Sequence, residues 1–311
     1  MREKTDTATR PARHRVGLDI GGTKTQAVLV DPSGALLATR RDPTKHGSEG
    51  LVRTAVEAVG ALLREAGPDA ARAWSLGVGV PGLVDAEGVM RFAANLPGLV
   101  ELPLRKIFGE RLGVPVVMDN DANVAAWGER CAGAGEGADD LLMVTIGTGI
   151  GGGIVLGGEL YRGAHGMAGE IGHTVVQLDG EPCQCGQRGC WEKYASGTAL
   201  NRIARDAGFD SSEMVVARAG ENDETALEVM STFTRWMAIG LAGLVNILDP
   251  SVVVLGGGLI EAGDLLLTPL RDWMGQLIEG SEHRPPVPLL PATLGERAGA
   301  IGAALLARAN G

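Results

Sequence analysis

The same succession of strands and glycine turns occurs twice along the chain, near residue 20 and near residue 147. Each copy contains an apolar strand, a turn with Gly and Thr, a second strand, another turn and a third strand. Strands of this kind joined by short turns predict two related α/β lobes. The expected strands cover residues 16–20, 25–30 and 35–40 in the first copy, and 141–146, 150–156 and 159–161 in the second.

Helical and buried-strand patterns fill the rest of the chain. Apolar residues at helical spacing predict helices over 51–65, 104–112, 122–130, 224–248 and 298–309, and apolar runs predict strands over 74–80, 114–118 and 252–255. Asp121 is expected to cap the helix that starts at residue 122. With 311 residues and no low-complexity linker, the two lobes should share one cleft.

Charge and hydropathy exclude several classes of protein. The net charge of −10 should repel nucleic acid in general, which leaves open a local basic patch. The longest apolar runs, such as residues 141–146, are too short to cross a bilayer. Residues 1–15 are polar and charged, so we expect a disordered tail without a secretory signal, and a cytoplasmic protein.

Two glycine turns could bind phosphate groups. The first is Asp19-Ile20-Gly21-Gly22-Thr23-Lys24, where backbone N–H groups can approach phosphate oxygens, Lys24 adds positive charge and Asp19 could hold a metal such as Mg²⁺. The second contains Gly147-Thr148-Gly149. Either turn alone could be an ordinary hairpin turn. Together, in matching strand contexts, they could hold a polyphosphate from both sides of a cleft.

A polar motif follows the predicted strand 114–118, at Asp119-Asn120-Asp121. Ligands of parallel α/β sheets bind at the carboxyl ends of strands. A carboxylate there can accept a proton from a hydroxyl that attacks phosphorus, which makes Asp121 the candidate general base. Asn120 could bind a neighbouring hydroxyl. The alternative is that both residues only cap a helix.

Four residues with metal-binding side chains lie within eighteen positions: His173, Cys183, Cys185 and Cys190. Three thiolates and one imidazole fit a closed, tetrahedral and therefore structural Zn²⁺ site. The alternative is a disulfide loop, but thiols stay reduced in the cytosol. Glu170, His173 and Glu192 surround this segment, and their groups suit the hydroxyls of a polyol, although either Glu could simply be surface charge.

These motifs resemble the ROK family (repressors, open reading frames, kinases) of the actin-like ATPase superfamily. The resemblance runs from about Val16 to the C-terminus. Its most specific part is Gly169-Glu170-Ile171-Gly172-His173 followed by Cys183-x-Cys185-Gly186-x-x-Gly189-Cys190-x-Glu192. It implies an α/β, two-lobed actin-like ATPase fold with ribonuclease-H-like cores and a central interlobe cleft. Residues 16–122 with 297–311 would form the small lobe, and residues 123–296 the large lobe with the zinc loop.

The resemblance also implies roles for individual residues. Asp121 would be the base, and His173 would serve twice, with one ring nitrogen on zinc and the other facing the sugar. Sugar would be bound by Asn95, Asn120, Asp121, Glu170, His173 and Glu192. The ATP site would comprise Asp19, Gly21, Gly22, Thr23, Lys24, Thr148 and Gly149, with Gly256, Gly257 and Gly258 near the adenosine.

The expected activity is transfer of the γ-phosphate of ATP to a hexose hydroxyl. The run Cys190-Trp191-Glu192-Lys193-Tyr194-Ala195-Ser196-Gly197 is glucokinase-like, so glucose is the first choice. N-acetylglucosamine or N-acetylmannosamine as substrate, and polyphosphate as donor, stay open. A repressor is disfavoured because about fifteen residues before the first strand cannot form a winged helix-turn-helix, and a sugar sensor because the kinase motifs are intact. We expect a homodimer or homotetramer that binds neither nucleic acid nor membrane.

Overall fold

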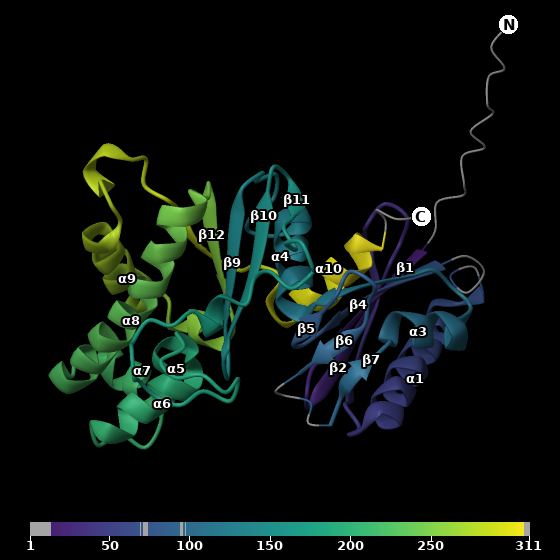
Figure 1. Cartoon of the computed structure of the whole chain (residues 1–311), viewed down its shortest axis with the longest axis horizontal. Helices are drawn as coiled ribbons and strands as arrows, with labels where there is room; N and C mark the ends of the chain where they lie inside the picture. The colour runs from purple at the N-terminus through teal and green to yellow at the C-terminus, as the bar shows by residue number, and fades with distance from the viewer. Residues whose placement is uncertain (1–13, 69, 71–73, 94–95, 97, 308–311) are drawn as a thin grey trace, which may run out of the picture.

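The computed structural model describes residues 14–68, 70, 74–93, 96 and 98–307 and places them in two lobes side by side (Figure 1). In chain order, the small lobe has β1 (His14–Ile20), β2 (Lys24–Val30), β3 (Leu36–Pro43), α1 (Ser48–Ala66), β4 (Trp74–Val80), β5 (Leu83–Val84), β6 (Met90–Phe92), β7 (Val100–Leu102), α3 (Leu104–Leu112) and β8 (Val116–Asn120). Asn95, a predicted sugar contact, and residues 1–13 of the predicted tail lie outside the described residues.

The chain then enters the large lobe through α4 (Asp121–Ala132). Its further elements are β9 (Leu141–Ile146), β10 (Ile150–Leu156), β11 (Glu159–Leu160), η1 (Ile171–His173), α5 (Glu192–Ala195), α6 (Gly197–Asp206), α7 (Ser212–Gly220), α8 (Glu224–Leu248), β12 (Val252–Gly256), η2 (Gly258–Ala262), α9 (Asp264–Leu277), η3 (Ser281–His283) and β13 (Leu289–Pro291). The chain ends with η4 (Gly295–Arg297) and α10 (Ala298–Leu306), which return to the small lobe.

The two main sheets have the same topology. Their strand orders are β3-β2-β1-β4-β8 and β11-β10-β9-β12-β13. In each sheet the first three strands of the chain are antiparallel neighbours, and the last two are added in parallel. The predicted repetition of two related α/β lobes is therefore confirmed at the level of strand pairing.

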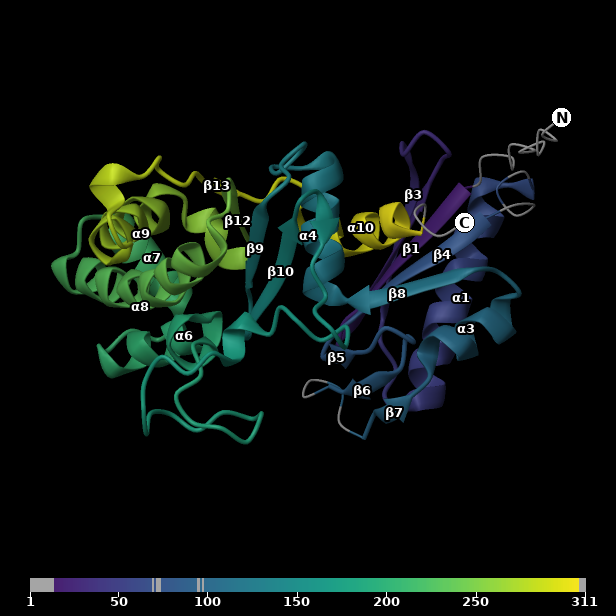
Figure 2. The ribbon, with the colours of Figure 1, turned by 45° about the horizontal axis from the view of Figure 1, so that its top comes forward.

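Two helices connect the lobes at the centre of the molecule. α4 packs on β10 and β9 of one sheet and on β4 and β8 of the other, while α10 packs on α4 and on β1 and β4 (Figure 2). The contact requires glycine: a Cβ on Gly302 would lie 1.7 Å from the carbonyl oxygen of Val124, and one on Gly77 would lie 1.8 Å from that of Ala303. Because α4 contacts both sheets, the lobe boundary after residue 122 stays a prediction.

A buried carboxylate ties the two connecting segments together. Glu129, on α4, is completely buried. Its Oε2 accepts hydrogen bonds from the backbone N–H groups of Ala134 and Thr293, at 2.8 and 3.1 Å, and its Oε1 accepts one from Leu294 at 2.8 Å. The segment that leads into α10 is thus held against α4.

Three local expectations were wrong. The first strand begins at His14, because Arg15 pairs with Val30 in the ladder and donates to the carbonyl oxygen of Asp31, so the predicted tail 1–15 is too long. The N-cap of α4 is Asn120 and not Asp121, because the Asn120 side chain accepts from two backbone N–H groups of the first turn. The strand expected over 114–118 covers Val116–Asn120 instead.

A third, small sheet of β5, β6 and β7 was not predicted, because strands of two or three residues are too short to show a period.

Among the residues that the structure describes, no helix has the length and apolar character needed to cross a membrane.

Candidate active site

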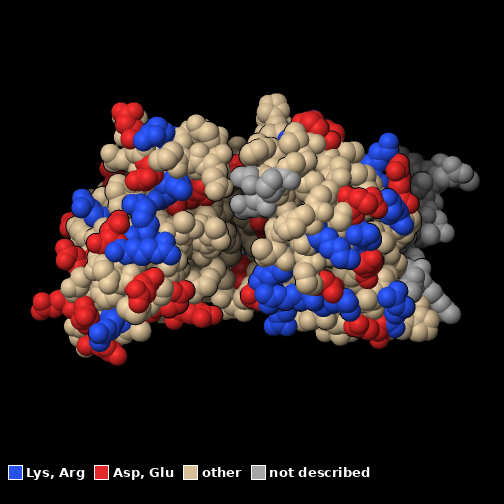
Figure 3. Space-filling model, turned by 90° about the horizontal axis from the view of Figure 1, so that it is seen from below, with Lys and Arg blue, Asp and Glu red and all other residues tan. Residues whose placement is uncertain are grey.

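The surface is hollowed between the lobes, and acidic side chains lie within the hollow (Figure 3). Asp121 begins α4, directly after β8, at the carboxyl end of a parallel strand. Burial raises the pKa of Asp121 above its ordinary value. Its Oδ1 accepts a hydrogen bond from the backbone N–H of Ala122 at 2.9 Å. The carboxylate therefore lies in a poorly solvated position, where its affinity for a proton is increased.

Asp19, at the end of β1, lies within electrostatic reach of Asp121. Burial raises the pKa of Asp19 from 3.8 to about 7, the charge of Asp121 adds to the increase, and the charge of Lys24 opposes it. Two carboxylates in one desolvated position are costly unless a cation or a proton accompanies them. The donor chemistry of this pair thus fits the predicted role of Asp19 toward a divalent cation.

Asn120 has little hydrogen-bonding capacity left. Its Oδ1 accepts from the N–H groups of Ala122 and Asn123, at 2.8 and 3.2 Å, and its Nδ2 donates to the carbonyl oxygen of Gly82 at 3.1 Å. One amide hydrogen remains for a ligand. Asn120 is therefore first a structural residue of the strand–helix junction.

The glycine turn of the small lobe is closed by a hydrogen bond from Gly21 N to Lys24 O at 2.8 Å. The ammonium group of Lys24 is 2.7 Å from Glu296, which also binds Arg41 at 2.8 Å. Lys24 thus faces a carboxylate of η4, a partner that the sequence did not suggest because 272 residues separate the two.

The glycine turn of the large lobe meets two other segments. Gly197 N donates to Gly147 O at 2.8 Å, and Thr198 Oγ1 donates to Thr148 O at 2.7 Å. Gly257 has φ +96°, and a Cβ there would lie 2.1 Å from the carbonyl oxygen of Ile146. The structure therefore brings together the predicted turns 147–149 and 256–258.

A cavity of about 710 Å³ opens at this junction. Among the residues that the structure describes, those that line it all belong to the large lobe, so the turn at Gly21 to Lys24 is not part of its wall. The lining includes the predicted Thr148 and Gly258 and, on α6 and α7, Asn201, Glu213 and Val216, which the sequence did not indicate. The cavity size and its mix of apolar and polar groups suit a nucleoside.

Three of the predicted sugar-binding residues lie close together. His173 Nε2 lies 3.9 Å from Glu170 Oε2, and His173 Nδ1 lies 4.0 Å from Glu192 Oε1. Burial raises the pKa of Glu170; the charges of Asp121 and Glu192 add to this increase, and His173 opposes it. Glu170 of the large lobe is thus within electrostatic reach of Asp121 at the start of α4.

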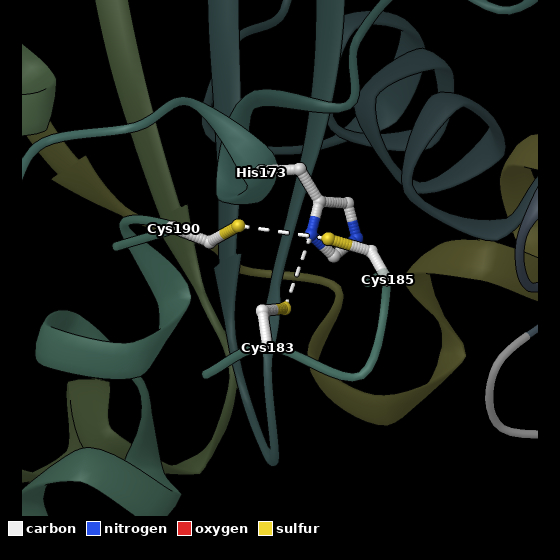
Figure 4. A group of neighbouring side chains, drawn as sticks. All are labelled: His173, Cys183, Cys185 and Cys190. Carbon is white, nitrogen blue, oxygen red and sulfur yellow. Dashed lines mark hydrogen bonds between the residues drawn. The ribbon is translucent and has the colours of Figure 1, made fainter. Parts of the chain in front are cut away.

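The cysteines and the histidine form one cluster (Figure 4). All four ligand atoms lie within 4.8 Å of one another. Cys183 Sγ is 3.7 Å from His173 Nδ1, and Cys185 Sγ is 3.6 Å from Cys190 Sγ. A tetrahedral ion with Zn–S bonds of 2.3 Å has ligand atoms about 3.7 Å apart, so the donor set and its spacing fit Zn²⁺. The structure has the four cysteines of the chain as thiols, without a disulfide.

One buried ion pair next to the candidate base was not predicted. Asp119 is 3% exposed, and its Oδ2 accepts from Arg162 Nε at 2.6 Å. Its Oδ1 accepts from Asn120 N at 2.9 Å and from Asn123 Nδ2 at 2.8 Å. Arg162 follows β11 of the large lobe, so the pair joins elements that are 43 residues apart in the sequence.

Comparison with known proteins identifies the family. Residues 15–310 match the model of the ROK family. The glucokinase of Streptomyces coelicolor is 38% identical, over 94% of this chain and 97% of that protein. The crystal structure of a ROK family glucokinase from Streptomyces griseus in complex with glucose and AMPPNP is 39% identical, covers 95% of this chain and 99% of that chain, and has a TM-score of 0.83.

A ROK hexokinase from Thermus thermophilus is also similar, with 39% identity, a TM-score of 0.80, and coverage of 95% of this chain and 98% of that chain. The expected two-lobed, actin-like kinase fold is confirmed by these structures. The chain belongs to the ROK family.

Proposed function

We propose that this protein phosphorylates glucose with ATP to give glucose 6-phosphate, with Asp121 as the general base. The observation that carries the proposal is the position of Asp121: a desolvated carboxylate at the end of a parallel strand, within electrostatic reach of Asp19 and of Glu170. The similarity to glucokinases along nearly the whole chain supports the choice of reaction and of sugar.

The chemistry follows from this placement. Asp121 accepts the proton of the sugar hydroxyl while the hydroxyl oxygen forms a bond to the γ-phosphorus. The bond from that phosphorus to the bridging oxygen breaks, and ADP leaves. Mg²⁺ bound with ATP supplies neutralisation of phosphate charge, and Asp19 would hold it directly or through water.

The other site residues bind the two substrates. The turns 147–149 and 256–258 and the cavity beside them would hold the nucleotide, and Gly21 to Lys24 would face its phosphates from the small lobe. Asn95, Asn120, Glu170, His173 and Glu192 would bind the sugar. The remaining amide hydrogen of Asn120 and the carboxylates of Glu170 and Glu192 suit hydroxyl groups, which both donate and accept.

A structural Zn²⁺ ion would hold the sugar side of the site. Its ligands would be His173 Nδ1 and the thiolates of Cys183, Cys185 and Cys190, while His173 Nε2 faces Glu170. When bound, the ion contributes no step of the reaction. Metal ligation would fix the ring of His173 and its tautomer.

Steady-state kinetics test the proposal. We expect kcat/KM to be highest for glucose with ATP, and lower for N-acetylglucosamine, N-acetylmannosamine or polyphosphate in their place. No glucose-dependent formation of ADP would refute the activity, and a higher kcat/KM for an N-acetylated hexosamine would reassign the sugar. Cytoplasmic location and a homodimer or homotetramer belong to the same proposal; sedimentation or light scattering measures the oligomeric state.

A further inference from the structure

A loop of the large lobe crosses the cleft and contacts the small lobe. This bridging loop, residues 161–169, follows β11 and ends just before Glu170. In Figure 2 it is the teal segment that reaches β5. Its ends are held on the large lobe: a Cβ on Gly169 would lie 2.9 Å from Gly152 O of β10, and Ala168 N donates to Arg162 O at 3.0 Å, which closes the loop.

The bridging loop has two contacts on the small-lobe side. The first is the Arg162–Asp119 ion pair, described above. The second is at the tip of the loop, where Gly166 has φ +83° and a Cβ would lie 2.7 Å from Ala86 N and 2.9 Å from the carbonyl carbon of Asp85. Asp85 itself is buried and held by Arg91. Ionic attraction and close backbone packing, two independent features, thus fasten the same loop.

Asp119 connects this loop to the turn that carries the candidate base. Its carboxylate binds Asn120 N and the side chain of Asn123, which flank Asp121 in the sequence. The same carboxylate binds Arg162, eight residues before Glu170. A displacement of Arg162 would therefore be transmitted to Glu170 on one side and to the start of α4 on the other.

We propose that Asp119 and Arg162 are positioning residues that set the separation between Asp121 and the sugar-binding Glu170 across the cleft. The proposal rests on the hexose kinase activity proposed above and adds residues without contact to either substrate. The ion pair is nearly buried on its Asp119 side, so the attraction is weakly screened by solvent. The cavity beside Thr148, which would hold the nucleotide, contains no residue of the bridging loop, so the pair should act on sugar binding and not on nucleotide binding.

The first test compares R162M with R162K and with the control R218M. Arg218 forms an exposed ion pair with Glu221 on the surface of the large lobe. Because small displacements of a binding group are costly, R162M should raise the KM for glucose about tenfold, with the KM for ATP within about twofold of wild type. R162K keeps the charge and should restore part of the loss, while R218M should match wild type. D119N should also raise the KM for glucose. In the double variant D119N/R162M this rise, expressed as a free energy, should be smaller than the sum of the rises in D119N and in R162M.

The second test leaves the charges unchanged. G166A would push the tip of the bridging loop away from Ala86, and G157A is its matched control, because Gly157 also has a positive φ, +57°, but no atom within 4 Å of an added Cβ. G166A should raise the KM for glucose, and G157A should not. Melting temperatures and glucose affinity by calorimetry are measured for every variant, so a failure to fold is recognised and sugar binding is read without turnover.

The outcomes separate this proposal from the proposed function. A glucose KM within about twofold of wild type in folded R162K, R162M and G166A would overturn the positioning role. Equal losses for glucose and ATP that follow the melting temperature would also overturn it, because they indicate a purely structural pair. If R162M and D119N do not fold, the KM values for glucose of R162K and G166A decide whether the ion pair has a positioning role. A wild-type protein that binds glucose but does not phosphorylate it would refute the activity alone, and the calorimetric comparison would still decide on the loop.

Discussion

The carboxylate of Glu192 lies against the backbone of Gly149, so close that a Cβ on Gly149 would be 2.4 Å from Glu192 Oε2. The other oxygen of this carboxylate accepts a hydrogen bond from the Cys183 thiol at 3.1 Å. A single side chain thus touches both the glycine turn of the large lobe and the metal-ligand cluster.

Gly149→Ala should therefore weaken the binding of both glucose and ATP. The added methyl group must displace Glu192 or the turn, so we expect the KM for glucose and the KM for ATP to rise together, by about tenfold. Gly243→Ala is the control, because an added Cβ there has open space and alanine favours a helix. Unchanged KM values in the Gly149 variant would show that the contact is not needed.

Asp121→Asn should abolish most turnover without loss of fold. General base catalysis contributes about 10²–10⁴-fold, so kcat should fall by that factor, while the dissociation constant for glucose, measured by calorimetry, should change little. The helix cap is Asn120, so α4 keeps its N-terminal hydrogen bonds. A kcat close to that of wild type would exclude Asp121 as the base. The exposed Asp206→Asn serves as the control.

Cys185→Ser should remove the metal and weaken sugar binding first. The loop that carries Cys183 and Cys185 has little buried apolar surface, so the ion would supply its order. We expect about one zinc per wild-type chain by mass spectrometry, and in the variant none, with a raised KM for glucose and a lower melting temperature. Cys131→Ser, outside the cluster, should keep its metal. Wild-type protein that is active and metal-free would contradict this scheme.

Asp19 should make stability depend on pH. Its pKa in the folded protein is about 7, above the ordinary 3.8, so between these values the folded state holds a proton that the unfolded chain has released. The contribution to stability is therefore full below 3.8 and is lost as the pH rises toward 7. Asp19→Asn cannot titrate, so its melting temperature minus that of wild type should increase from about pH 5 to about pH 8 without nucleotide or divalent metal. A difference in melting temperature that stays constant over this pH range would show that Asp19 is not desolvated.

Local patterns in the sequence were the most reliable guide. The cluster of His173 and three cysteines could be predicted because all four residues lie in one short segment. Asp121 could be placed because a strand followed by a helix puts it at a known kind of sheet edge. The repetition of the two sheets followed from the glycine turns in matching strand contexts.

Contacts between distant segments could not be predicted. Arg162 contacts Asp119 only when the two lobes pack together, and no periodic pattern in the sequence around either residue indicates that the two form an ion pair. Asn201 and Val216 line the cavity beside Thr148 because α6 and α7 fold back toward this turn, an arrangement set by tertiary packing. The predicted N-cap of α4, Asp121, differs from the observed N-cap, Asn120, by one residue, and sequence patterns do not resolve helix ends to one residue.

The carboxylate of Glu129 has a consequence for how the molecule denatures. Each lobe has its own large apolar core, and proteins built in this way often melt in separate steps. Here the two segments that cross between the lobes, α4 and the segment that leads into α10, are hydrogen-bonded to each other through Glu129. In addition, α4 and α10 pack without room for a methyl group between them. Heat absorption should therefore give a single peak whose calorimetric and van't Hoff enthalpies agree, and Glu129→Gln should split it into two.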